Sequence, residues 1–333
     1  MATEQNDKPR KRQPILAPEL GFGTRASKAH QRLVNPDGSY NVRRKGDRKL
    51  TLADAYHTLI MLGWWKFFAI IIAGFIAINF LFGAIYYLLG TEHLVGLAGD
   101  SPSDKFWESF FFSAQTLTTV GYGRMSPVGF LPSAIAAIES AVGLLAFALS
   151  TSLLWGRFSR PTAKIMYSQS VLVSPYRGGK GVMFRAINGG RSRLIEIEAD
   201  VTMARTEMID GVPKRRFYRL MLELNRISVL PTSWTLVHPV NEESPFYGRS
   251  TDDVEREETE VLVMLKAFDE TYSQTVYSRT SYKSHQIVTG AKFIPMMEDG
   301  EDGVIILDMD KLNAYEKVEL PKELPSNGSQ LMT

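Results

Sequence analysis

The sequence contains no cysteine among its 333 residues, which excludes a disulfide framework and a thiolate metal site. Its five histidines are scattered without the H-E-x-x-H spacing or another catalytic pattern, so no chemistry on a substrate is implied. A net charge of +2 gives no global drive toward nucleic acid. From these absences we expect no enzyme activity, no cofactor and no nucleic-acid partner.

Long hydrophobic runs are prominent in the first half of the chain. Residues 67–89 have Asn79 as their only strongly polar side chain, and aromatic residues lie at both ends of the run. Phe130–Gly156 has a single charged residue, Glu139. Each run exceeds the ~20 residues needed to cross ~30 Å of hydrocarbon, so the pattern predicts two transmembrane helices.

Basic residues flank both spans on their outer sides. Residues 1–50 hold twelve Lys or Arg against five acids, and Arg157, Arg160 and Lys164 follow the second span. The connecting loop, residues 90–129, has only two basic residues. The positive-inside rule therefore predicts that both termini are cytoplasmic.

Two shorter helices are predicted beside the spans. Leu52–Leu62 has the spacing of an amphipathic helix in the membrane interface, although an ordinary extension of the first span also fits. Asp104–Leu117 is apolar but too short to cross a membrane, which favours a re-entrant helix. We expect Ser103 or Asp104 to cap the start of that helix.

Residues 118–123, TTVGYG, follow this short helix directly. Irregular backbone at membrane depth is tolerated only where it is buried in protein or lines a watery path. If four chains meet on an axis, their carbonyl oxygens form stacked rings, which is how potassium selectivity is built. The ring carbonyls would come from Thr119, Val120, Gly121 and Tyr122, with the Thr119 hydroxyl below them.

The two glycines of this segment, Gly121 and Gly123, permit the positive φ values that point successive carbonyls inward. A phosphate-binding loop fits poorly, because no Lys-Ser/Thr pair follows the glycines and no strand precedes them. We expect Tyr122 to pack outward against Trp107 or Phe111 of the pore helix.

From about residue 162 the pattern changes to short alternating runs separated by Gly, Pro, Asn and Asp. Many short strands with regular turn signals predict a β-sandwich. The clearest runs are VLVSPY, VMFRAI, LIEIEADVTMARTEM, RRFYRLMLEL, WTLVHPV, VLVMLKAF and GVIILDM.

Four stretches of the sequence together resemble the inward-rectifier potassium channel family, in its prokaryotic branch. They are FFFSAQTLTTVGYG, GRFSRPTAK, HPVNEESPFYG and SRTSY. The resemblance covers residues 40–315. It implies a homotetramer in a bacterial plasma membrane, with an α-helical pore domain of two transmembrane helices plus a re-entrant pore helix, and a cytoplasmic immunoglobulin-like all-β sandwich domain.

The resemblance also implies the division of the chain. The segments are residues 1–50 (cytoplasmic N-terminal segment), 51–63 (interfacial slide helix), 64–160 (transmembrane pore domain), 161–320 (cytoplasmic β-sandwich) and 321–333 (loose tail).

Several functional positions carry over from the family by resemblance. Thr119–Gly123 match the selectivity filter that holds K⁺ through backbone carbonyls, and Thr118 lies at its base. Gly143 matches a mid-helix hinge, although a glycine for close helix packing explains it equally well. Trp155 matches a bulky gate at the inner mouth; a membrane-interface anchor is the alternative.

Three basic residues, Arg157, Arg160 and Lys164, match positions that contact anionic lipid, and they also fit simple positive-inside topology. The loop that narrows the cytoplasmic pore matches the stretch that begins with Asp269, Glu270, Thr271 and Tyr272. Magnesium or polyamines are the expected pore blockers.

Other positions depart from the family pattern. Gln115 stands where many relatives have an acid, so the ion pair behind the filter is absent or replaced by a hydrogen bond. Phe147 replaces the acid of strong rectifiers, so we expect weak rectification. Ala267 stands where relatives often have glycine. Glu139 lies about 160° from Trp155 on a straight helix at ~100° per residue, so we expect it to face the pore helix and filter backbone.

The prediction is a potassium-selective inward rectifier that is modulated by anionic lipid. The alternatives are a non-selective two-span cation channel and a membrane-anchored protein whose sandwich binds a ligand. A membrane anchor needs one span and no re-entrant helix, so the predicted elements disfavour the membrane-anchored binding protein.

Overall fold

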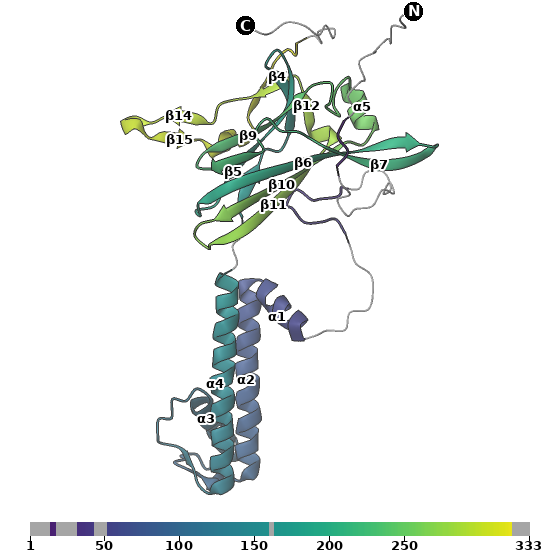
Figure 1. Ribbon diagram of the computed structural model, residues 1–333. Helices are drawn as coiled ribbons and strands as arrows, with labels where there is room; N and C mark the ends of the chain where they lie inside the picture. The colour runs from purple at the N-terminus through teal and green to yellow at the C-terminus, as the bar shows by residue number, and fades with distance from the viewer. Residues whose placement is uncertain (1–13, 18–31, 43–51, 160–162, 322–333) are drawn as a thin grey trace, which may run out of the picture. The chain divides into compact units, whose positions relative to one another are not determined.

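The computed structural model describes residues 14–17, 32–42, 52–159 and 163–321 (Figure 1). The chain divides into two compact units. One comprises residues 46–160 and is helical; the other comprises residues 1–45 and 161–333 and is built from β-strands.

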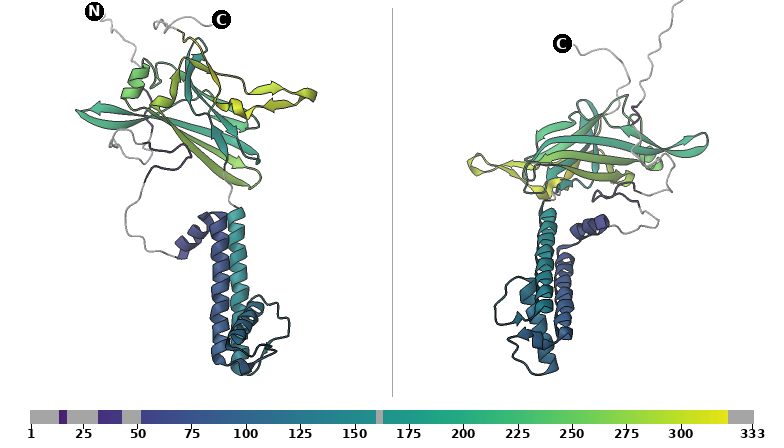
Figure 2. Two further views of the ribbon diagram at one scale, coloured as in Figure 1. Left: turned by 180° about the vertical axis from the view of Figure 1, so that it is seen from behind. Right: turned by 60° about the horizontal axis from the view of Figure 1, so that its bottom comes forward.

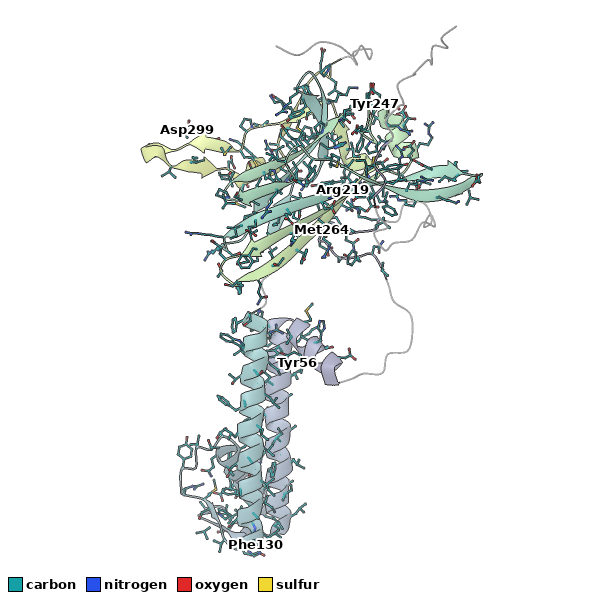
Figure 3. The ribbon with its side chains drawn as sticks, viewed as in Figure 1. Tyr56, Phe130, Arg219, Tyr247, Met264 and Asp299 are labelled. Atoms are coloured by element: carbon teal, nitrogen blue, oxygen red, sulfur yellow. The ribbon has the colours of Figure 1, made fainter. Side chains whose placement is uncertain are left out.

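The described residues of the helical unit contain four α-helices, which were all expected from the sequence. They are α1 (Leu52–Met61), α2 (Trp64–Leu89), α3 (Pro102–Leu117) and α4 (Phe130–Phe158). In both views of Figure 2, α2 and α4 run side by side, and α3 packs against them near the start of α4. Figure 3 shows Tyr56 of α1 and Phe130 of α4 at opposite ends of this pair.

The two long helices, α2 and α4, have the length and composition of membrane spans, with 26 and 29 residues. Few of their residues are buried within the chain, so most apolar side chains face outward, as they do in a bilayer or against other copies. The buried residues are Phe67, Asn79, Gly83 and Tyr86 in α2, and Pro132, Glu139 and Gly143 in α4.

The start of α3 differs from the prediction. Ser101, rather than Ser103 or Asp104, is the N-cap, and its hydroxyl accepts a hydrogen bond from the Asp104 amide at 3.1 Å. Pro102 occupies the first helical turn, where its missing N–H is tolerated and its fixed φ suits the helix. The predicted cap was wrong because this proline moves the helix start toward the N-terminus.

A two-stranded sheet of β1 (Leu94–Val95) and β2 (Ser126–Pro127) closes the loop around α3. The Val128 amide donates to the His93 carbonyl at 2.8 Å beside it. The residues that leave TTVGYG are therefore tied back to the chain that follows α2.

The β unit is a sandwich of two five-stranded sheets, which confirms the predicted class. One sheet has the order β11-β10-β6-β7 with β8 on β6, and the other has β12-β4-β5-β3 with β9 on β5. The β12–β4 pair is parallel. The strands of the two sheets are β3 (Ile165–Tyr167), β4 (Val171–Tyr176), β5 (Gly179–Asn188), β6 (Leu194–Ile209), β7 (Val212–Arg219), β8 (Arg226–Val229), β9 (Ser233–Val240), β10 (Glu260–Asp269), β11 (Gln274–Lys283) and β12 (Ile287–Thr289).

The core of the sandwich forms where the inward-facing positions of both sheets meet. Phe184 and Leu236 come from one sheet, and Ile197, Met203 and Leu265 come from the other; all five are almost fully buried. Smaller elements surround this core: α5 (Thr251–Arg256), the pair β13 (Ala291–Phe293) and β16 (Tyr315–Lys317), and the hairpin β14 (Met297–Asp299) and β15 (Ile305–Leu307). This last hairpin, which carries Asp299, projects from the sandwich in Figure 3.

The described parts of the N-terminal segment dock on the sandwich. The Ala17 amide donates to the Phe217 carbonyl, and the Arg219 amide donates to the Ile15 carbonyl, both at 3.0 Å, so this stretch extends the edge of β7. Val34 is buried in a small apolar cluster with Phe217. These parts of residues 1–50 are thus anchored to the sheet by backbone hydrogen bonds and apolar contacts.

Candidate functional site: the TTVGYG segment and the helices around it

The backbone of TTVGYG alternates between two conformations. Thr118 ends α3 with φ −82°, whereas Thr119, Gly121 and Gly123 have φ values of 57°, 53° and 83°. Val120 and Tyr122 lie outside the positive-φ region. Such alternation of right- and left-handed residues turns consecutive N–H groups to the same side. A β-branched residue such as Thr119 at positive φ is a conformational outlier, and such outliers cluster at functional sites.

Three successive amides of this segment, those of residues 120–122, converge on one residue of α3, Gln115. The Val120 and Gly121 amides donate to the Gln115 carbonyl at 2.9 and 3.3 Å. The Tyr122 amide donates to Gln115 Oε1 at 3.3 Å. Three consecutive N–H groups thus hold the segment against the pore helix. Of the two alternatives for position 115, no ion pair or a hydrogen bond, the Gln115 side chain has a hydrogen bond, from the Tyr122 amide.

The carbonyls of residues 119–122 differ from these amides in their hydrogen bonding. None of them accepts a hydrogen bond from any residue in the described part of the chain. Backbone carbonyls left without a protein partner need water or a cation, especially where lipid excludes water. The segment therefore presents a row of free acceptor groups on the side away from Gln115.

The side chain of Tyr122 does not behave as predicted within one chain. It is 84% exposed, and it makes no ring contact with Trp107 or Phe111 in the described part of the chain. Trp107 packs instead against its α3 neighbours and Phe80 of α2. Tyr122 and Phe111 both line a hollow of about 510 Å³ beside the segment, so a single chain leaves this side open.

An ion pair that the sequence interpretation missed lies above the segment. Arg124 Nη2 lies 3.4 Å from Glu108 Oε1. The Glu108 carboxylate also accepts a hydrogen bond from the Ala98 amide at 2.9 Å. One acidic residue of α3 thus ties together the chain before the pore helix and the chain after TTVGYG.

Glu139 faces the pore helix, as predicted, but it contacts side chains there rather than the TTVGYG backbone. The Tyr86 hydroxyl of α2 donates to Glu139 Oε2 at 2.7 Å, and the Ser113 hydroxyl of α3 is hydrogen-bonded to Glu139 Oε1. Ser113 Oγ also lies 3.2 Å from Asn79 Oδ1. These four side chains, almost fully buried, form a polar cluster that joins α2, α3 and α4.

Gly143 of α4 lies where helices approach most closely. A Cβ at this position would stand 1.8 Å from the carbonyl oxygen of Leu117, the last residue of α3. No side chain fits there without moving backbone, so close packing accounts for the glycine. Whether it also acts as a hinge remains a prediction.

Three side chains of α4 recur every fourth residue and share one face of the helix: Phe147, Thr151 and Trp155. Phe147 is 72% exposed and Trp155 is 73% exposed, and Thr151 is also exposed. The face carries no charge along this stretch. A single chain therefore leaves an apolar stripe of α4 uncovered below TTVGYG.

Arg157 is engaged inside the helical unit. Its guanidinium donates to the carbonyls of Leu59 and Ile60 at 2.8 and 2.9 Å, and to the Leu62 carbonyl at 2.6 Å. It also stacks over the rings of Trp64 and Phe67, at 4.5 and 4.6 Å from the centroids. Arg157 thus holds the end of α1 against α4, and its contact with anionic lipid stays a prediction.

The other basic positions are less constrained. Arg160, and the basic cluster before α1, lie outside the described residues. The backbone carbonyl of Lys164 accepts a hydrogen bond from the Gly189 amide at 2.7 Å, and the residue is exposed.

The loop between β10 and β11 is a tight turn. The buried Asp269 carboxylate accepts hydrogen bonds from the Thr271 and Tyr272 amides at 2.9 and 3.2 Å. Glu270, Thr271 and Tyr272 are exposed. Asp269 therefore braces the turn, and Glu270 is the acid that this loop presents to solvent. Ala267 is buried in β10, paired with Val276, beside a β-bulge.

The residues that the structure describes contain no group of three or more His, Asp or Glu side chains that could hold a metal ion.

Comparison with known proteins agrees with this geometry. The profile of the inward rectifier potassium channel C-terminal domain matches residues 165–330, and an ion channel profile matches residues 74–159. The chain is 31% identical over 284 residues to the inward rectifier potassium channel Kirbac3.1 of Paramagnetospirillum magnetotacticum, an alignment that covers 85% of this chain and 95% of the relative.

Two vertebrate relatives are more distant. ATP-sensitive inward rectifier potassium channel 12 of Gallus gallus is 25% identical over 293 residues, covering 81% of this chain and 68% of the relative. The protein of the same name from Bos taurus is 25% identical over 312 residues, covering 83% and 71%. The two units of the chain thus define a membrane ion channel with a C-terminal β domain. The chain belongs to the inward rectifier potassium channel family.

Proposed function

We propose that four copies of this chain form a pore in which residues 119–123 select potassium, with Thr118 at its base. The observation that carries this proposal is the division of backbone groups in TTVGYG. The N–H groups of residues 120–122 bond to Gln115 of the pore helix, while the carbonyls of residues 119–122 have no partner in the described part of the chain. Rings of such carbonyls replace the hydration shell of K⁺.

Assembly of a homotetramer is supported by the apolar surface that one chain leaves open near TTVGYG. Phe111, Val120 and Tyr122 line the hollow beside the segment, and each is more than half exposed. Apolar surface of this kind marks an interaction site. One chain also supplies too few oxygens at each level to surround a cation, so the same contact that covers Tyr122 completes the binding sites.

The inner helix supplies the proposed gate. The exposed stripe of Phe147, Thr151 and Trp155 would face the axis, and four Trp155 rings would close the inner mouth by a hydrophobic constriction. Gly143 packs against the Leu117 carbonyl at the end of the pore helix. A hinge in α4 would therefore move only the part of the helix that follows this contact.

Regulation is proposed at two levels. Anionic lipid would act through Arg160 and Lys164, each basic group near an anionic surface contributing ~1 kcal/mol, while Arg157 contributes by holding α1 in place. The loop with Glu270 and Tyr272 would narrow the cytoplasmic pore. Magnesium or a polyamine would block the pore only weakly, because the α4 stripe lacks an acid.

The membrane arrangement follows from the two spans and the positive-inside rule. We place both termini and the sandwich in the cytoplasm of a bacterial plasma membrane. No covalent chemistry and no cofactor enter the proposal. A membrane-anchored binding protein would not need a re-entrant helix whose C-terminal end carries free carbonyls.

The filter assignment is tested by Gly121→Ala in chains reconstituted in liposomes, with potassium and sodium flux as the readout. An added Cβ at Gly121 meets no atom within 4 Å in the chain, so the strain comes from φ 53°, about 1–2 kcal/mol per residue. The matched control is Gly74→Ala, which also meets no atom but lies in the regular helix α2. We expect loss of selectivity in the first variant only. Equal potassium-over-sodium flux in both variants would reject the assignment.

A further inference from the structure

The polar cluster of Asn79, Tyr86, Ser113 and Glu139 contains more acceptors than donors if Glu139 is ionised. Ser113 has a single hydroxyl proton, yet its oxygen lies within hydrogen-bonding distance of both Glu139 Oε1 and Asn79 Oδ1. A carboxylate would take this proton, because it can only accept. The buried Asn79 Oδ1 would then lose its donor.

The orientation of the Asn79 amide is fixed by its other contact. Asn79 Nδ2 donates to the Phe75 carbonyl at 2.7 Å, and a carbonyl cannot donate. Turning the amide over would set two acceptors against each other. Oδ1 therefore points at Ser113 and requires a proton from it.

One additional proton resolves the conflict. If Glu139 Oε1 carries a proton, it donates to Ser113 Oγ, and the Ser113 hydroxyl is free to donate to Asn79. The Tyr86 hydroxyl donates to Glu139 Oε2, and Asn79 donates to Phe75, so the hydrogen bonds run in one direction from Tyr86 to Phe75. Every member of the cluster is then satisfied, which is the condition under which a buried polar network rigidifies its surroundings.

No charged partner compensates an ionised Glu139. Besides Glu139 itself, the ionisable residues of the three helices are Lys66, Tyr86, Tyr87, Asp104, Lys105, Glu108 and Arg157. Of these, Tyr86 alone hydrogen-bonds to Glu139 in the described part of the chain, and Glu108 and Arg157 have other partners. A fully buried carboxylate without a cation is strongly disfavoured in a membrane.

We propose that Glu139 is a neutral carboxylic acid, and that it positions the pore helix through the directional chain Tyr86–Glu139–Ser113–Asn79. Ser113 lies two residues before Gln115, the residue that holds the TTVGYG amides. A shift of Ser113 would therefore be transmitted to the filter. This inference rests on the proposed function for its flux readout, while the charge state of Glu139 can be measured without it.

The charge state is tested by infrared spectroscopy of wild-type and Glu139→Gln tetramers in lipid. We expect the C=O stretching band of a protonated carboxylic acid at neutral pH in the wild type, and its loss in Glu139→Gln. If the spectra of the wild type and Glu139→Gln differ only by a carboxylate band, Glu139 is ionised and the proposal is wrong. The infrared measurement does not depend on ion flux. It therefore tests the charge state of Glu139 even if the wild type shows no potassium selectivity, and in that case only the proposed function has failed.

The positioning role is tested by flux in Glu139→Gln, Glu139→Ala, Ser113→Ala and Ser109→Ala. Glu139→Gln should keep the wild-type potassium-over-sodium ratio, because its amide can donate to Ser113 and accept from Tyr86. Ser113→Ala should lower the ratio by roughly fivefold, the factor that corresponds to the net loss of one hydrogen bond. Ser109→Ala is the matched control, since this buried serine of α3 bonds only to the Lys105 carbonyl of its own helix, at 2.8 Å.

Two flux results contradict the positioning role. One is a potassium-over-sodium flux ratio in Ser113→Ala that equals the ratio in Ser109→Ala. The other is a loss of selectivity in Glu139→Gln that is as large as the loss in Glu139→Ala. If Ser113→Ala does not assemble, the comparison of Glu139→Gln with Glu139→Ala decides the matter.

Discussion

Replacing Arg157 by lysine separates the two roles that this residue can have. A lysine keeps the positive charge, so an attraction to anionic headgroups would survive the change. It cannot reproduce the planar fork of the guanidinium, which donates to the carbonyls of Leu59, Ile60 and Leu62 at once. If Arg157 holds α1 against α4, Arg157→Lys should therefore weaken the contact between these helices even though it keeps the positive charge.

The expected size of the effect follows from the contacts. The last carbonyls of a helix have no partner within it, and Arg157 supplies donors to those at the end of α1. A hydrogen bond to a charged group contributes about 1.5–3 kcal/mol, and a lysine can restore about one of the three. The ring contacts with Trp64 and Phe67 add about 0.5–1 kcal/mol each at exposed sites. We expect Arg157→Lys to destabilise the α1–α4 contact by roughly 3 kcal/mol.

Hydrogen–deuterium exchange of the reconstituted tetramer measures this effect where it arises. Amides of α1 should exchange faster in Arg157→Lys, with little change in α3. Lys164→Arg is the control, because it also interchanges lysine and arginine, but at another predicted lipid-binding position. Unchanged α1 exchange in Arg157→Lys, together with a lost lipid response in Arg157→Ala, would refute the clamp and restore the lipid-binding role.

Three further predictions concern the gate, rectification and the sandwich. Trp155→Ala should raise basal potassium flux, because four smaller side chains no longer close the mouth; wild-type flux at normal expression would make Trp155 an interface anchor. Phe147→Asp should sharpen magnesium or polyamine block at positive voltage, since one charge pair at 4 Å contributes ~4 kcal/mol at an effective dielectric of 20; an unchanged block would place this stripe away from the axis. Burial lowers the pKa of His238 below its ordinary value of 6.5, so the unfolded chain binds a proton that the fold excludes, and sandwich stability should fall as pH drops below about 6.5. His238→Gln should flatten that dependence in a denaturation series, and an equally steep fall would assign it to other groups.

The helices and strands could be predicted because their signals are local. Both spans, the re-entrant helix and the β-sandwich follow from runs and periodicities within single segments. The φ values of Gly121 and Gly123 were also foreseeable, since glycine supplies this conformation without steric conflict. The start of α3 was misplaced because the effect of Pro102 on the cap was not considered.

The contacts that position the site could not be predicted, because they join distant segments or involve backbone groups. Ser113 is 34 residues from Asn79 and 26 from Glu139, and only the packing of three helices brings them together. Arg157 binds carbonyls 95 to 98 residues away, and no side chain in the sequence marks those acceptors. The turn at 269–272 belongs to the loop predicted to narrow the cytoplasmic pore, and it uses the Asp269 carboxylate as a backbone brace, a contact that the sequence does not mark.

Thr119 illustrates how the proposed tetramer would support the backbone conformation of TTVGYG. A β-branched residue at φ 57° is strained by about 1–2 kcal/mol relative to an ordinary backbone. The contacts that one chain offers against this strain are the amide bonds to α3, which restrain one side of the segment. The carbonyl side gains no protein bond, and like dipoles that converge there repel one another. In the proposed tetramer, neighbouring copies would cover Tyr122, and a cation would bind the carbonyls once the ring is complete. Assembly and potassium binding would then stabilise the same backbone conformation and reinforce each other.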